Sequence, residues 1–576
     1  MASHKRKKNK RQQIFLIAAV VVLVVIIVVI TMLTTVVKKY TPSRETTDYA
    51  AYYNLEEGEV LLSLDNEILE EKGLYLDGEV YVSYNVLHSY LNERFYWDET
   101  EQILRYTLPE GTVSVAAETA DYTTGKESST FSYTIVHMED GEMYLSLSFV
   151  AAYTDIRWEF YEEPDRAVIS DEWGEVEYTT VKHDTQVREL GGIKSNILTE
   201  IQKNDRVIVL DEMDSWVQIC TEDGFVGYIK GSALGESQTE VYASDYEEPV
   251  FTHITKDFTI NMAWHQVTNQ SANSQVATVL STTNGVNVLS PTWFYLDDNE
   301  GGIASLASAD YVSYCHEQGI EVWALVSNLE NSEVDTTQVL SVTSSRDALV
   351  NNLISAAVKY DLDGINVDFE SLEGEAGTGF LQFIRELSLK CESNDMVLSI
   401  DNYAPASYNT FYSRDEQAVF ADYIVLMAYD EHYNGSEEGS VASLSFVTQA
   451  VEDTLEEVPA EQLVLGIPFY TRLWKLTPDE TAENGSYTVT SEALGMSEAE
   501  SRVAANGAVY EWLEDCGQYY AEYEYDGSTY KIWLEDQNSI AEKLGVMQSY
   551  GLAGASFWKL GYEKNTVWDT IVGYMQ

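Results

Sequence analysis

Cysteine is scarce in this chain, with four cysteines among 576 residues. They stand at positions 220, 315, 391 and 516, with no CxxC pair and no histidine at ligand spacing. This spacing indicates no metal site, and we expect no cofactor. Four cysteines could pair in three ways, but buried free thiols are the simpler expectation.

Basic residues are also few, with 34 lysines and arginines against 95 aspartates and glutamates, and the net charge is −61. Six of the basic residues fall within residues 1–13, which contain no acid, so the rest of the chain is more acidic still. An acidic surface repels phosphate backbones, which argues against nucleic-acid partners. The sequence also lacks GxGxxG and GxxxxGK[ST], so nucleotide binding has no support.

One long segment contains no charge at all. Residues 14–37 are long enough to cross a bilayer as a helix, and no small-x-small cleavage site of a signal peptide is evident. The basic residues 1–13 before this segment predict a cytoplasmic N-terminus. We therefore expect a single-pass protein of the cell membrane whose residues after Lys38 lie outside the cell.

Residues 46–175 contain a weak internal repeat. LDGEVYVSYNVLHSYLNERFYWDETEQILRY (76–106) matches EDGEMYLSLSFVAAYTDIRWEFYEEPDRAVI (139–169), and each copy predicts a strand, a helix and a Trp-bearing strand. The repeat resembles the small domain at the N-terminal end of copper amine oxidases and of many exported bacterial proteins. No histidine cluster or redox tyrosine motif accompanies it, so we expect a stalk or wall-binding spacer.

Short strands and regularly spaced turns follow in residues 178–236. This segment resembles a bacterial SH3-like domain, a small β-barrel whose family members often bind cell-wall peptides. The matching residues are Val187-Arg188, Trp216, Asp223-Gly224 and Gly227-Tyr228-Ile229. Trp216 is expected in the core of this domain rather than stacked on a ligand, and the acidic residues 237–253 predict a linker.

Residues 254–576 alternate between apolar strands and helical segments, which predicts an α/β fold, a (β/α)8 TIM barrel. The strand candidates are apolar on both faces, as is typical of parallel strands covered by helices. They are INMAW (260–264), VNVLSPTWF (286–294), IEVWALVSN (320–328), LDGINVDFE (362–370), VLSI (397–400), YIVLMAYD (423–430), LVLGIPFY (463–470) and GASFWKLG (554–561). Residues 472–545, between strands seven and eight, exceed one helix and predict an inserted α+β subdomain.

The strongest chemical signal is DGINVDFE, from Asp363 to Glu370. Side chains alternate along a strand, so Asn366, Asp368 and Glu370 should point together into the barrel. Glu370 then lies at the C-terminal end of its strand, where such barrels carry their active sites. Carboxylates are costly to bury without partners, so this row indicates function rather than structure.

DGINVDFE resembles the signature of glycoside hydrolase family 18. Met427-Ala428-Tyr429-Asp430 resembles that family's strand-six motif, and GASFWKLG, with Trp558, resembles its last strand. The resemblance covers 254–576. It is nearest to the branch with spore-germination and cell-wall N-acetylglucosaminidases, as AWHQVTN, MAYDEHY and WLEDQNSIAEKL suggest.

The resemblance implies roles for the matching residues. Glu370 would act as acid and then as base, while the substrate's own 2-acetamido oxygen is the nucleophile. Asp368 would accept a hydrogen bond from the acetamido N–H, and Tyr429 would donate a hydrogen bond to the acetamido oxygen. The substrate-binding candidates are Asn366, Asp363, Met427, Asp430, Trp558, Trp264 and Trp293.

Three tryptophans in this set differ in what is expected of them. Trp558 is expected to form the apolar floor under the sugar. Trp264 and Trp293 lie near the ends of strands one and two, where they either stack on sugars or pack in the core. His265 and His432 are expected to belong to the scaffold, since neither has a serine or cysteine partner for a triad.

Asn366 departs from the commoner family pattern, which has aspartate at this position, paired with the next aspartate. Asparagine can still hydrogen-bond Asp368 but cannot share its proton, and the loss of a like charge favours ionisation of Asp368. We therefore expect Asp368 to stay anionic through the cycle. On this basis, Asn366→Asp should shift the acidic limb of the pH–rate profile upward.

The sequence predicts a membrane-anchored extracellular glycosidase that cleaves β-1,4 bonds in glycan containing N-acetylglucosamine. Peptidoglycan is the expected substrate because wall-associated domains precede the barrel, and chitin or chitooligosaccharide is the alternative. The expected partners are this glycan, the cell wall through the SH3-like and repeat domains, and the membrane. A non-catalytic carbohydrate-binding protein is the alternative from another class, and the presence of Glu370 argues against it.

Overall fold

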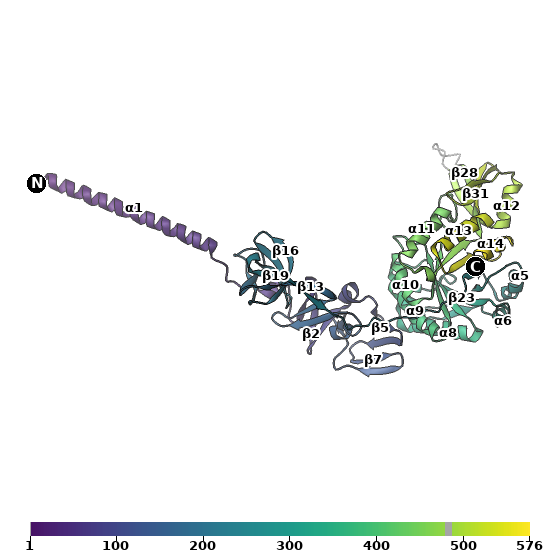
Figure 1. Cartoon of the computed structure of the whole chain (residues 1–576), viewed down its shortest axis with the longest axis horizontal. Coiled ribbons are helices and arrows are strands. Elements are labelled where there is room, and N and C mark those ends of the chain that lie inside the picture. The colour runs from purple at the N-terminus through teal and green to yellow at the C-terminus, as the bar shows by residue number, and fades with distance from the viewer. Residues whose placement is uncertain (1, 479–486, 576) are drawn as a thin grey trace. The chain divides into compact units, whose positions relative to one another are not determined.

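The computed structural model describes residues 2–478 and 487–575, and the chain forms two compact units (Figure 1). The first unit contains Met1–Glu93, Ala117–Asp121 and Thr130–Glu248, and the second contains Arg94–Ala116, Tyr122–Ser129 and Pro249–Gln576. The segment 46–175, expected as one repeat domain, is thus divided between the two units. Each unit is described by itself.

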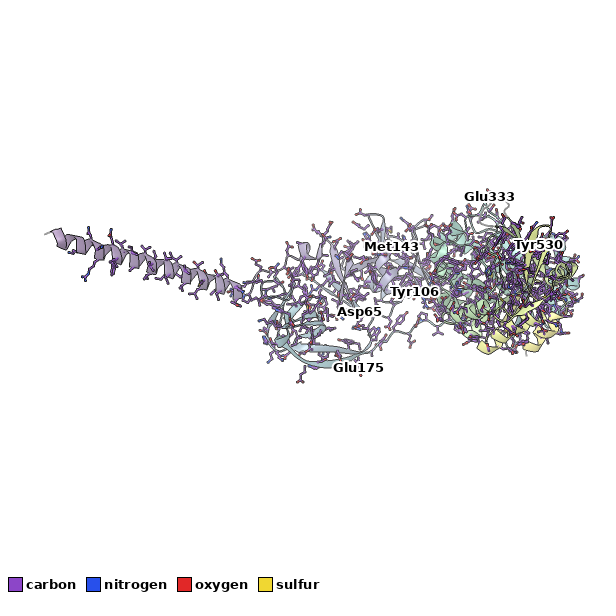
Figure 2. All side chains as sticks on the ribbon, turned by 90° about the horizontal axis from the view of Figure 1, so that it is seen from above. Asp65, Tyr106, Met143, Glu175, Glu333 and Tyr530 are labelled. Atoms are coloured by element: carbon purple, nitrogen blue, oxygen red, sulfur yellow. The ribbon has the colours of Figure 1, made fainter. Side chains whose placement is uncertain are left out.

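Helix α1 (Ala2–Tyr40) of the first unit contains the uncharged segment. Its apolar side chains are exposed and project on all sides of the helix (Figure 2). In the part of the chain that the structure describes, only this helix, over Lys8–Tyr40, has the length and hydropathy of a membrane span. A signal anchor and a membrane-spanning helix share these properties.

The internal repeat folds as two copies of a strand, a short helix and a hairpin. The first copy comprises β3 (Glu79–Ser83), α3 (Tyr84–Val86), β4 (Tyr96–Asp98) and β5 (Ile103–Leu108), and the second comprises β10 (Glu142–Ser146), α4 (Leu147–Val150), β11 (Arg157–Tyr161) and β12 (Arg166–Ser170). Strands β3 and β10 pair antiparallel, with Val82 opposite Leu145. These two residues hold the same position in the two copies, so a local two-fold axis relates the paired strands.

The two hairpins of the repeat join different sheets. Strands β11 and β12 extend a seven-stranded sheet of the first unit, in the order β11-β12-β1-β2-β3-β10-β9. Its further strands are β1 (Glu59–Leu64), β2 (Glu67–Leu76) and β9 (Val136–Glu139). Strands β4 and β5 instead begin a five-stranded sheet that continues with β6 (Gly111–Ala116), β7 (Asp121–Thr124) and β8 (Glu127–Thr130).

The SH3-like domain is an antiparallel sheet in the order β15-β14-β18-β17-β16-β13-β19. Its strands are β13 (Gly174–Val181), β14 (Thr185–Arg188), β15 (Ile197–Ile201), β16 (Arg206–Met213), β17 (Trp216–Thr221), β18 (Val226–Lys230) and β19 (Leu234–Tyr242). Val217 and Ile219 of β17 enter its core. Trp216 precedes Val217 and so faces the other side; it is only partly buried, and the prediction that it packs in this core is wrong.

Strand β19 runs into the segment 237–253 that the sequence predicted as a linker. Residues up to Tyr242 pair with β13, where Tyr242 lies opposite Gly174. Cross-strand pairing, which a polar composition does not reveal, accounts for the difference.

The second unit is built around a closed barrel of eight parallel strands, in the order β20-β33-β27-β26-β25-β24-β23-β21, with β20 also paired to β21. The strands are β20 (Ile260–His265), β21 (Val288–Leu296), β23 (Glu321–Ser327), β24 (Gly364–Asp368), β25 (Val397–Tyr403), β26 (Tyr423–Met427), β27 (Leu463–Pro468) and β33 (Gly554–Trp558). All eight overlap the predicted segments, so the (β/α)8 fold is confirmed. A short strand β22 (Ile303–Ser305) pairs antiparallel with the end of β21.

The barrel has an apolar layer on each side of its strands, as their double-sided hydrophobicity predicts. Residues such as Met262, Val288 and Val425 fill the interior, while Leu289, Val367 and Leu426 pack against the surrounding helices. The helices are α5 (Val276–Leu280), α6 (Ala309–Glu317), α7 (Thr336–Ser341), α8 (Thr343–Tyr360), α9 (Gly377–Glu392), α10 (Arg414–Phe420), α11 (Leu444–Leu455), α13 (Gln537–Tyr550) and α14 (Val567–Tyr574).

The predicted insertion between strands seven and eight is also present. It contains β28 (Tyr470–Pro478), β29 (Tyr487–Gly495), α12 (Met496–Ala505), β30 (Glu511–Leu513), β31 (Gln518–Tyr525) and β32 (Ser528–Leu534). Tyr530 of β32, labelled in Figure 2, stacks on Tyr523 of β31 with ring centroids 5.1 Å apart. Trp474 of β28 donates to the carbonyl of Gly439 at 2.8 Å, which ties the insertion to the loop after β26.

Candidate active site

A cavity of about 170 Å³ opens at the C-terminal ends of the barrel strands. The side chains that line it come from β20, β24, β25, β26, β33 and the first residue of β28, or from the residues just after β24 and β26. They are Trp264, Asp368, Glu370, Asp401, Tyr403, Met427, Tyr429, Asp430, Tyr470 and Trp558. Seven of them are site residues that the sequence predicted, while Asp401, Tyr403 and Tyr470 are additions from the structure.

Glu370 lies two residues beyond the end of β24, and Asn328 holds its backbone on both sides. Its backbone N–H donates to Asn328 Oδ1 at 2.9 Å, and its carbonyl accepts from Asn328 Nδ2 at 3.0 Å. Its side-chain Oε2 accepts from the hydroxyl of Tyr403 at 2.7 Å. Burial raises the pKa of Glu370, the Tyr403 hydrogen bond lowers it, and nearby acids, chiefly Asp430, raise it further.

Asp368 and Asp401 form a pair of buried acids below Glu370, on the neighbouring strands β24 and β25. Asp368 is 8% exposed, and its Oδ1 has no hydrogen-bond partner among the described residues. Burial raises the pKa of Asp368 well above its usual value, and the like charge of Asp401 adds to this. Burial likewise raises the pKa of Asp401, against the lowering effect of a hydrogen bond from Asn366.

Asn366 lies under the pocket with all of its hydrogen-bonding capacity used. Its Oδ1 accepts from Trp264 Nε1 at 3.0 Å and from Ser290 Oγ at 2.9 Å. Its Nδ2 donates to Ser399 Oγ at 3.0 Å and to Asp401 Oδ1 at 2.7 Å. The indole N–H is a donor only, which fixes the orientation of the amide. Asn366 therefore has no hydrogen left for Asp368.

This arrangement corrects the expectation that Asp368 stays anionic because asparagine occupies position 366. A like charge is present after all, because Asp401 supplies it from the adjacent strand. Together with burial, it favours the protonated form of Asp368. The sequence reasoning considered one strand alone and so missed the second acid.

Two tyrosines, Tyr429 and Tyr470, also line the pocket. Tyr470 donates its hydroxyl to Asp430 Oδ1 at 2.5 Å, and Asp430 adopts a positive φ of 57° directly after Tyr429. The Tyr429 ring packs edge-on against Tyr470, and its hydroxyl has no hydrogen-bond partner within the described ranges. Burial and the surrounding carboxylates raise the pKa of Tyr429, so this hydroxyl is a donor.

The pocket also has an aromatic base. Trp558 and Trp264 meet edge to face with centroids 5.7 Å apart, and Met427 lies beside them in the lining. Trp264 is nearly fully buried. It lines the cavity and donates its indole N–H to Asn366, so it contacts both the pocket and the barrel interior. Trp558 is less buried and offers an apolar surface to a ligand.

The structure does not bring Trp293 and Asp363, two of the predicted substrate-binding residues, to this pocket. Trp293 is fully buried, donates to Asn273 Oδ1 at 2.9 Å, and packs between barrel and helices. Ser290 points inward to Asn366, so Trp293, three residues later, faces outward. Asp363 precedes β24 at the other end of the barrel, where its Oδ2 accepts from Val322 N at 2.7 Å and contacts His316 Nε2 at 2.8 Å.

His265 and His432, the two histidines considered from the sequence, belong to the scaffold. His265 Nδ1 lies 2.9 Å from the hydroxyl of Tyr311, and burial lowers its pKa to about 4. His432 Nδ1 lies 2.9 Å from the carbonyl of Ser440. All four cysteines are free, and three of them are buried.

Three residues of the pocket, Asp401, Tyr403 and Tyr470, were not predicted from the sequence. Asp401 and Tyr403 stand in DNY, at the end of a strand that was predicted to stop at residue 400. Extending that strand by its alternation would have turned both inward, with Ser399. Tyr470 ends a predicted strand, and its position offered no such signal.

Comparison with known proteins agrees with this geometry. A sequence model of the glycosyl hydrolases family 18 matches residues 238–563, and one of the bacterial SH3 domain matches residues 184–235. The uncharacterized glycosylase YvbX of Bacillus subtilis (strain 168) is 25% identical over 299 residues, which cover 50% of this chain and 84% of that protein.

Two further comparisons reach the catalytic unit. The cortical fragment-lytic enzyme of Bacillus anthracis is 21% identical over 256 residues, which cover 43% of this chain and 58% of that enzyme, less than two thirds of its length. The C-terminal domain of a putative chitinase from Desulfitobacterium hafniense DCB-2 shares the fold, with a TM-score of 0.50, 18% identity and coverage of 56% of this chain and 100% of that domain. Since the family model spans more than half of the chain and the cavity at its strand ends contains the expected acids, this chain belongs to the glycosyl hydrolases of family 18.

Proposed function

We propose that this glycosidase cleaves β-1,4 bonds beside N-acetylglucosamine by substrate-assisted, retaining catalysis with Glu370 as the acid. The observation that carries the proposal is the buried Oδ1 of Asp368, which has no hydrogen-bond partner among the described residues. An unsatisfied buried acceptor is costly. The N–H of a 2-acetamido group bound beside Glu370 would satisfy it, which favours an acetamido sugar over a plain one.

In the first step the carbonyl oxygen of the acetamido group attacks C1 of the same sugar. The bond from C1 to the leaving oxygen breaks, and the proton of Glu370 passes to that oxygen. The first step thus closes an oxazolinium ring between the acetamido oxygen and C1. In the second step Glu370 takes a proton from water, the water oxygen attacks C1, and the bond from C1 to the acetamido oxygen breaks, which opens the oxazolinium ring. Because its pKa is raised, Glu370 holds the proton that the first step needs. The hydrogen bond from Tyr403 stabilises the Glu370 carboxylate afterwards.

The other lining residues orient the reacting sugar. Tyr429 has a free hydroxyl for the acetamido oxygen, and Asp368 holds the acetamido nitrogen. Trp558 forms the apolar floor under the ring, while Met427 and Asp430 border the same sugar. Asn366 does not touch substrate and acts as a positioning residue through Asp401.

Asp401 takes the place of the second aspartate in the commoner family pattern. It stands on β25 instead of β24, and the Asn366 amide holds it at 2.7 Å. The like charge of Asp401 disfavours a second negative charge on Asp368, so the two buried acids favour carrying one negative charge between them over two. Asp368 then becomes fully anionic when the cationic oxazolinium forms above it and offsets that charge.

Peptidoglycan is the substrate we propose. The SH3-like domain supports binding to the cell wall, and a relative named a cortical fragment-lytic enzyme supports a wall glycan. The fold shared with a putative chitinase makes chitin the alternative substrate. A binding protein without turnover is the alternative from another class.

The same proposal includes a membrane anchor. Residues 1–13 would be a cytoplasmic tail and 14–37 the span, followed outside the cell by the repeat segment 46–175 as a stalk, the SH3-like domain 178–236, the segment 237–253 and the catalytic barrel 254–576. The six basic residues before an uncharged helix support this orientation.

The test compares the full chain with its Glu370→Gln variant on purified peptidoglycan and on chitin oligomers, with products read by mass spectrometry. Loss of the acid should slow cleavage by about 10²- to 10⁴-fold. Fragments ending in reducing N-acetylglucosamine from the wild type alone would establish the activity and the role of Glu370. Products from chitin only would move the substrate to chitin, and no products from either would favour the binding protein.

A further inference from the structure

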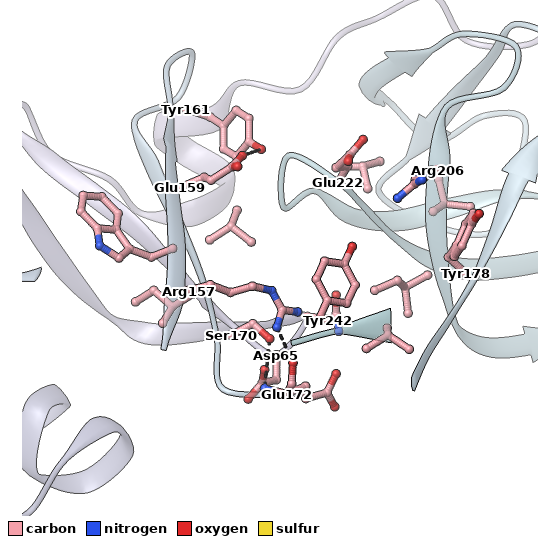
Figure 3. A pocket seen from close by; sticks show the side chains of 18 residues that line it. Asp65, Arg157, Glu159, Tyr161, Ser170, Glu172, Tyr178, Arg206, Glu222 and Tyr242 are labelled. Carbon is pink, nitrogen blue, oxygen red and sulfur yellow. Dashed lines mark hydrogen bonds between the residues drawn. The ribbon is translucent and has the colours of Figure 1, made fainter. Parts of the chain in front are cut away.

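A second cavity, of about 310 Å³, lies within the first unit between hairpin β11–β12 and the SH3-like sheet (Figure 3). Its volume is at the lower end of the range for small-ligand sites. Part of its wall is apolar and formed by β-branched residues: Val168, Ile169, Val176, Val207 and Ile208. All of its lining residues lie outside the catalytic unit.

One edge of the cavity is fixed by Arg166 of β12, which is 3% exposed. Its guanidinium donates to the Asp223 carbonyl at 2.5 Å and to Asp223 Oδ2 at 2.6 Å, and it lies 4.2 Å from the Phe225 ring centroid. The next residue, Gly224, has a φ of +86°, and a Cβ there would come within 2.6 Å of Val168 Cγ2. The SH3-like turn thus packs tightly on β12.

The other edge is fixed by the chain that follows β19. The Tyr246 hydroxyl donates to the carbonyl of Tyr153 at 3.0 Å, and Ser244 bonds to the carboxylate of Asp155. Trp173 donates its indole N–H to the carbonyl of Asp155 at 3.1 Å. Hydrogen bonds therefore hold together the segments around the cavity, so a ligand would meet a preformed site and would not have to organise it.

Arg157 of β11 points into this cavity with its charge unpaired. Its guanidinium donates to the backbone carbonyl of Glu172 and lies 4.3 Å from the Tyr242 ring and 5.2 Å from the Trp173 ring. No carboxylate is within ion-pair distance of it in the described part of the chain, although the chain carries 95 acids. Arg206, the other cation of the lining, is paired with Glu240.

A carboxylate without a partner stands on the SH3-like side of the cavity. Glu222 follows β17, is exposed, and forms no hydrogen bond or ion pair with any described residue. Arg157 and Glu222 thus present opposite charges to one cavity from its two sides (Figure 3) and do not pair. A ligand that carries both charges would satisfy both groups.

We infer that this cavity binds a short peptide that has a free carboxylate and a free ammonium group. The carboxylate lies on Arg157, whose planar guanidinium can bind both of its oxygens, and the ammonium group lies on Glu222. The apolar wall accommodates small aliphatic side chains. Sugar stacking is disfavoured, because Arg157 covers one face of Tyr242 and Arg206 lies 4.6 Å from the Tyr178 ring.

Titration calorimetry on the full chain in mild detergent tests this with trialanine in three forms, with both termini free, N-acetylated or C-amidated. The free peptide should bind, and Arg157→Met and Glu222→Gln should each weaken it by about tenfold or more, the loss of one charge-assisted contact. Glu222→Gln should not weaken the N-acetylated peptide further. Glu222 is exposed and has no hydrogen bond or ion pair with a described residue, so its variant keeps the test valid if Arg157→Met unfolds.

Arg502→Met, which removes a partly exposed arginine of the catalytic unit, and Glu370→Gln should leave peptide binding unchanged. Glu370→Gln also separates this site from the proposed catalysis, since it removes turnover only. The inference is overturned if no form of trialanine binds at millimolar concentration, or if the free and blocked peptides bind equally. It is equally overturned if both cavity variants bind like the wild type, or if N-acetylglucosamine oligomers occupy the cavity and trialanine does not.

Discussion

Asn366 and Asp401 face each other across β24 and β25 under the catalytic pocket, joined by a hydrogen bond of 2.7 Å. The amide fixes the carboxylate, and the carboxylate in turn acts on Asp368 through its charge. The proton balance of this site therefore depends on a residue that lies on a different strand from the DGINVDFE motif.

Asp401→Asn should move the acidic limb of the pH–rate profile to lower pH by about one unit. Burial and the like charge of Asp401 raise the pKa of Asp368, so Asp368 gains its charge only at higher pH. Without that like charge it ionises at lower pH, and an activity that needs the anion persists there. The amide introduced at position 401 can still accept from Asn366, which preserves the geometry.

The double variant Asn366→Asp/Asp401→Asn is the matched control. It keeps one acid and one amide, as in the wild type, but with their positions swapped. Its acidic limb should return toward that of the wild type. An acidic limb that stays in place in Asp401→Asn would contradict the role given to Asp401. The measurement is kcat/KM against pH on a soluble oligosaccharide substrate.

Tyr403→Phe should move the alkaline limb to higher pH by roughly one unit. The Tyr403 hydroxyl donates to Glu370 at 2.7 Å and stabilises its carboxylate, which lowers the pKa of Glu370. Without this bond the acid keeps its proton to higher pH. Tyr412→Phe removes a nearby hydroxyl that bonds the Phe369 carbonyl instead and should leave the limb in place. A downward shift in Tyr403→Phe would refute this account.

At the scale of elements, hairpin β4–β5 provides the N-terminal cap that helix α8 lacks. Val342 stands at the N-cap position and has no side-chain acceptor. Asp98 Oδ2 accepts from Thr343 N at 2.6 Å, and Glu101 Oε2 accepts from Ser344 N at 3.0 Å. These contacts explain why residues 94–116 belong to the catalytic unit, although their sequence repeat places them with the first.

Asp98→Ala should destabilise the first turn of α8 by about 1–2 kcal/mol, the range for loss of a capping carboxylate at a helix N-terminus. Hydrogen exchange of the α8 amides should accelerate by roughly 5- to 30-fold. Glu99→Ala, which changes an exposed neighbour, serves as the control and should exchange like the wild type. Unchanged protection of α8 in Asp98→Ala would show that the helix does not need this cap.

For the whole molecule, the proposed anchor predicts where the protein is found in the cell. The full chain should stay with membranes after alkaline extraction, and a chain that begins at residue 45 should be soluble, because α1 supplies the long apolar surface. Protease added outside intact, wall-stripped cells should digest the catalytic unit. A mature protein in the medium that lacks residues 1–40 would instead identify α1 as a cleaved signal.

The sequence by itself determined the barrel and the position of its acid. Each barrel strand lies in a largely apolar segment, and the alternation in DGINVDFE turns Asn366, Asp368 and Glu370 inward whatever their neighbours are. These are local properties of the chain, so composition and period suffice to predict them. The two-copy repeat was found for the same reason, since each copy encodes its own strand, helix and hairpin.

Only the tertiary structure decided which other residues meet Glu370 and where each hairpin packs. Asp401, Tyr403 and Tyr470 reach the pocket from other strands because the closed barrel brings their C-terminal ends together. Trp293, equally near a strand end, is turned away by its register. The charge state of Asp368 and the capping of α8 by Asp98 likewise depend on contacts between distant segments. Such contacts follow from packing and strand register, which no local spacing in the chain encodes.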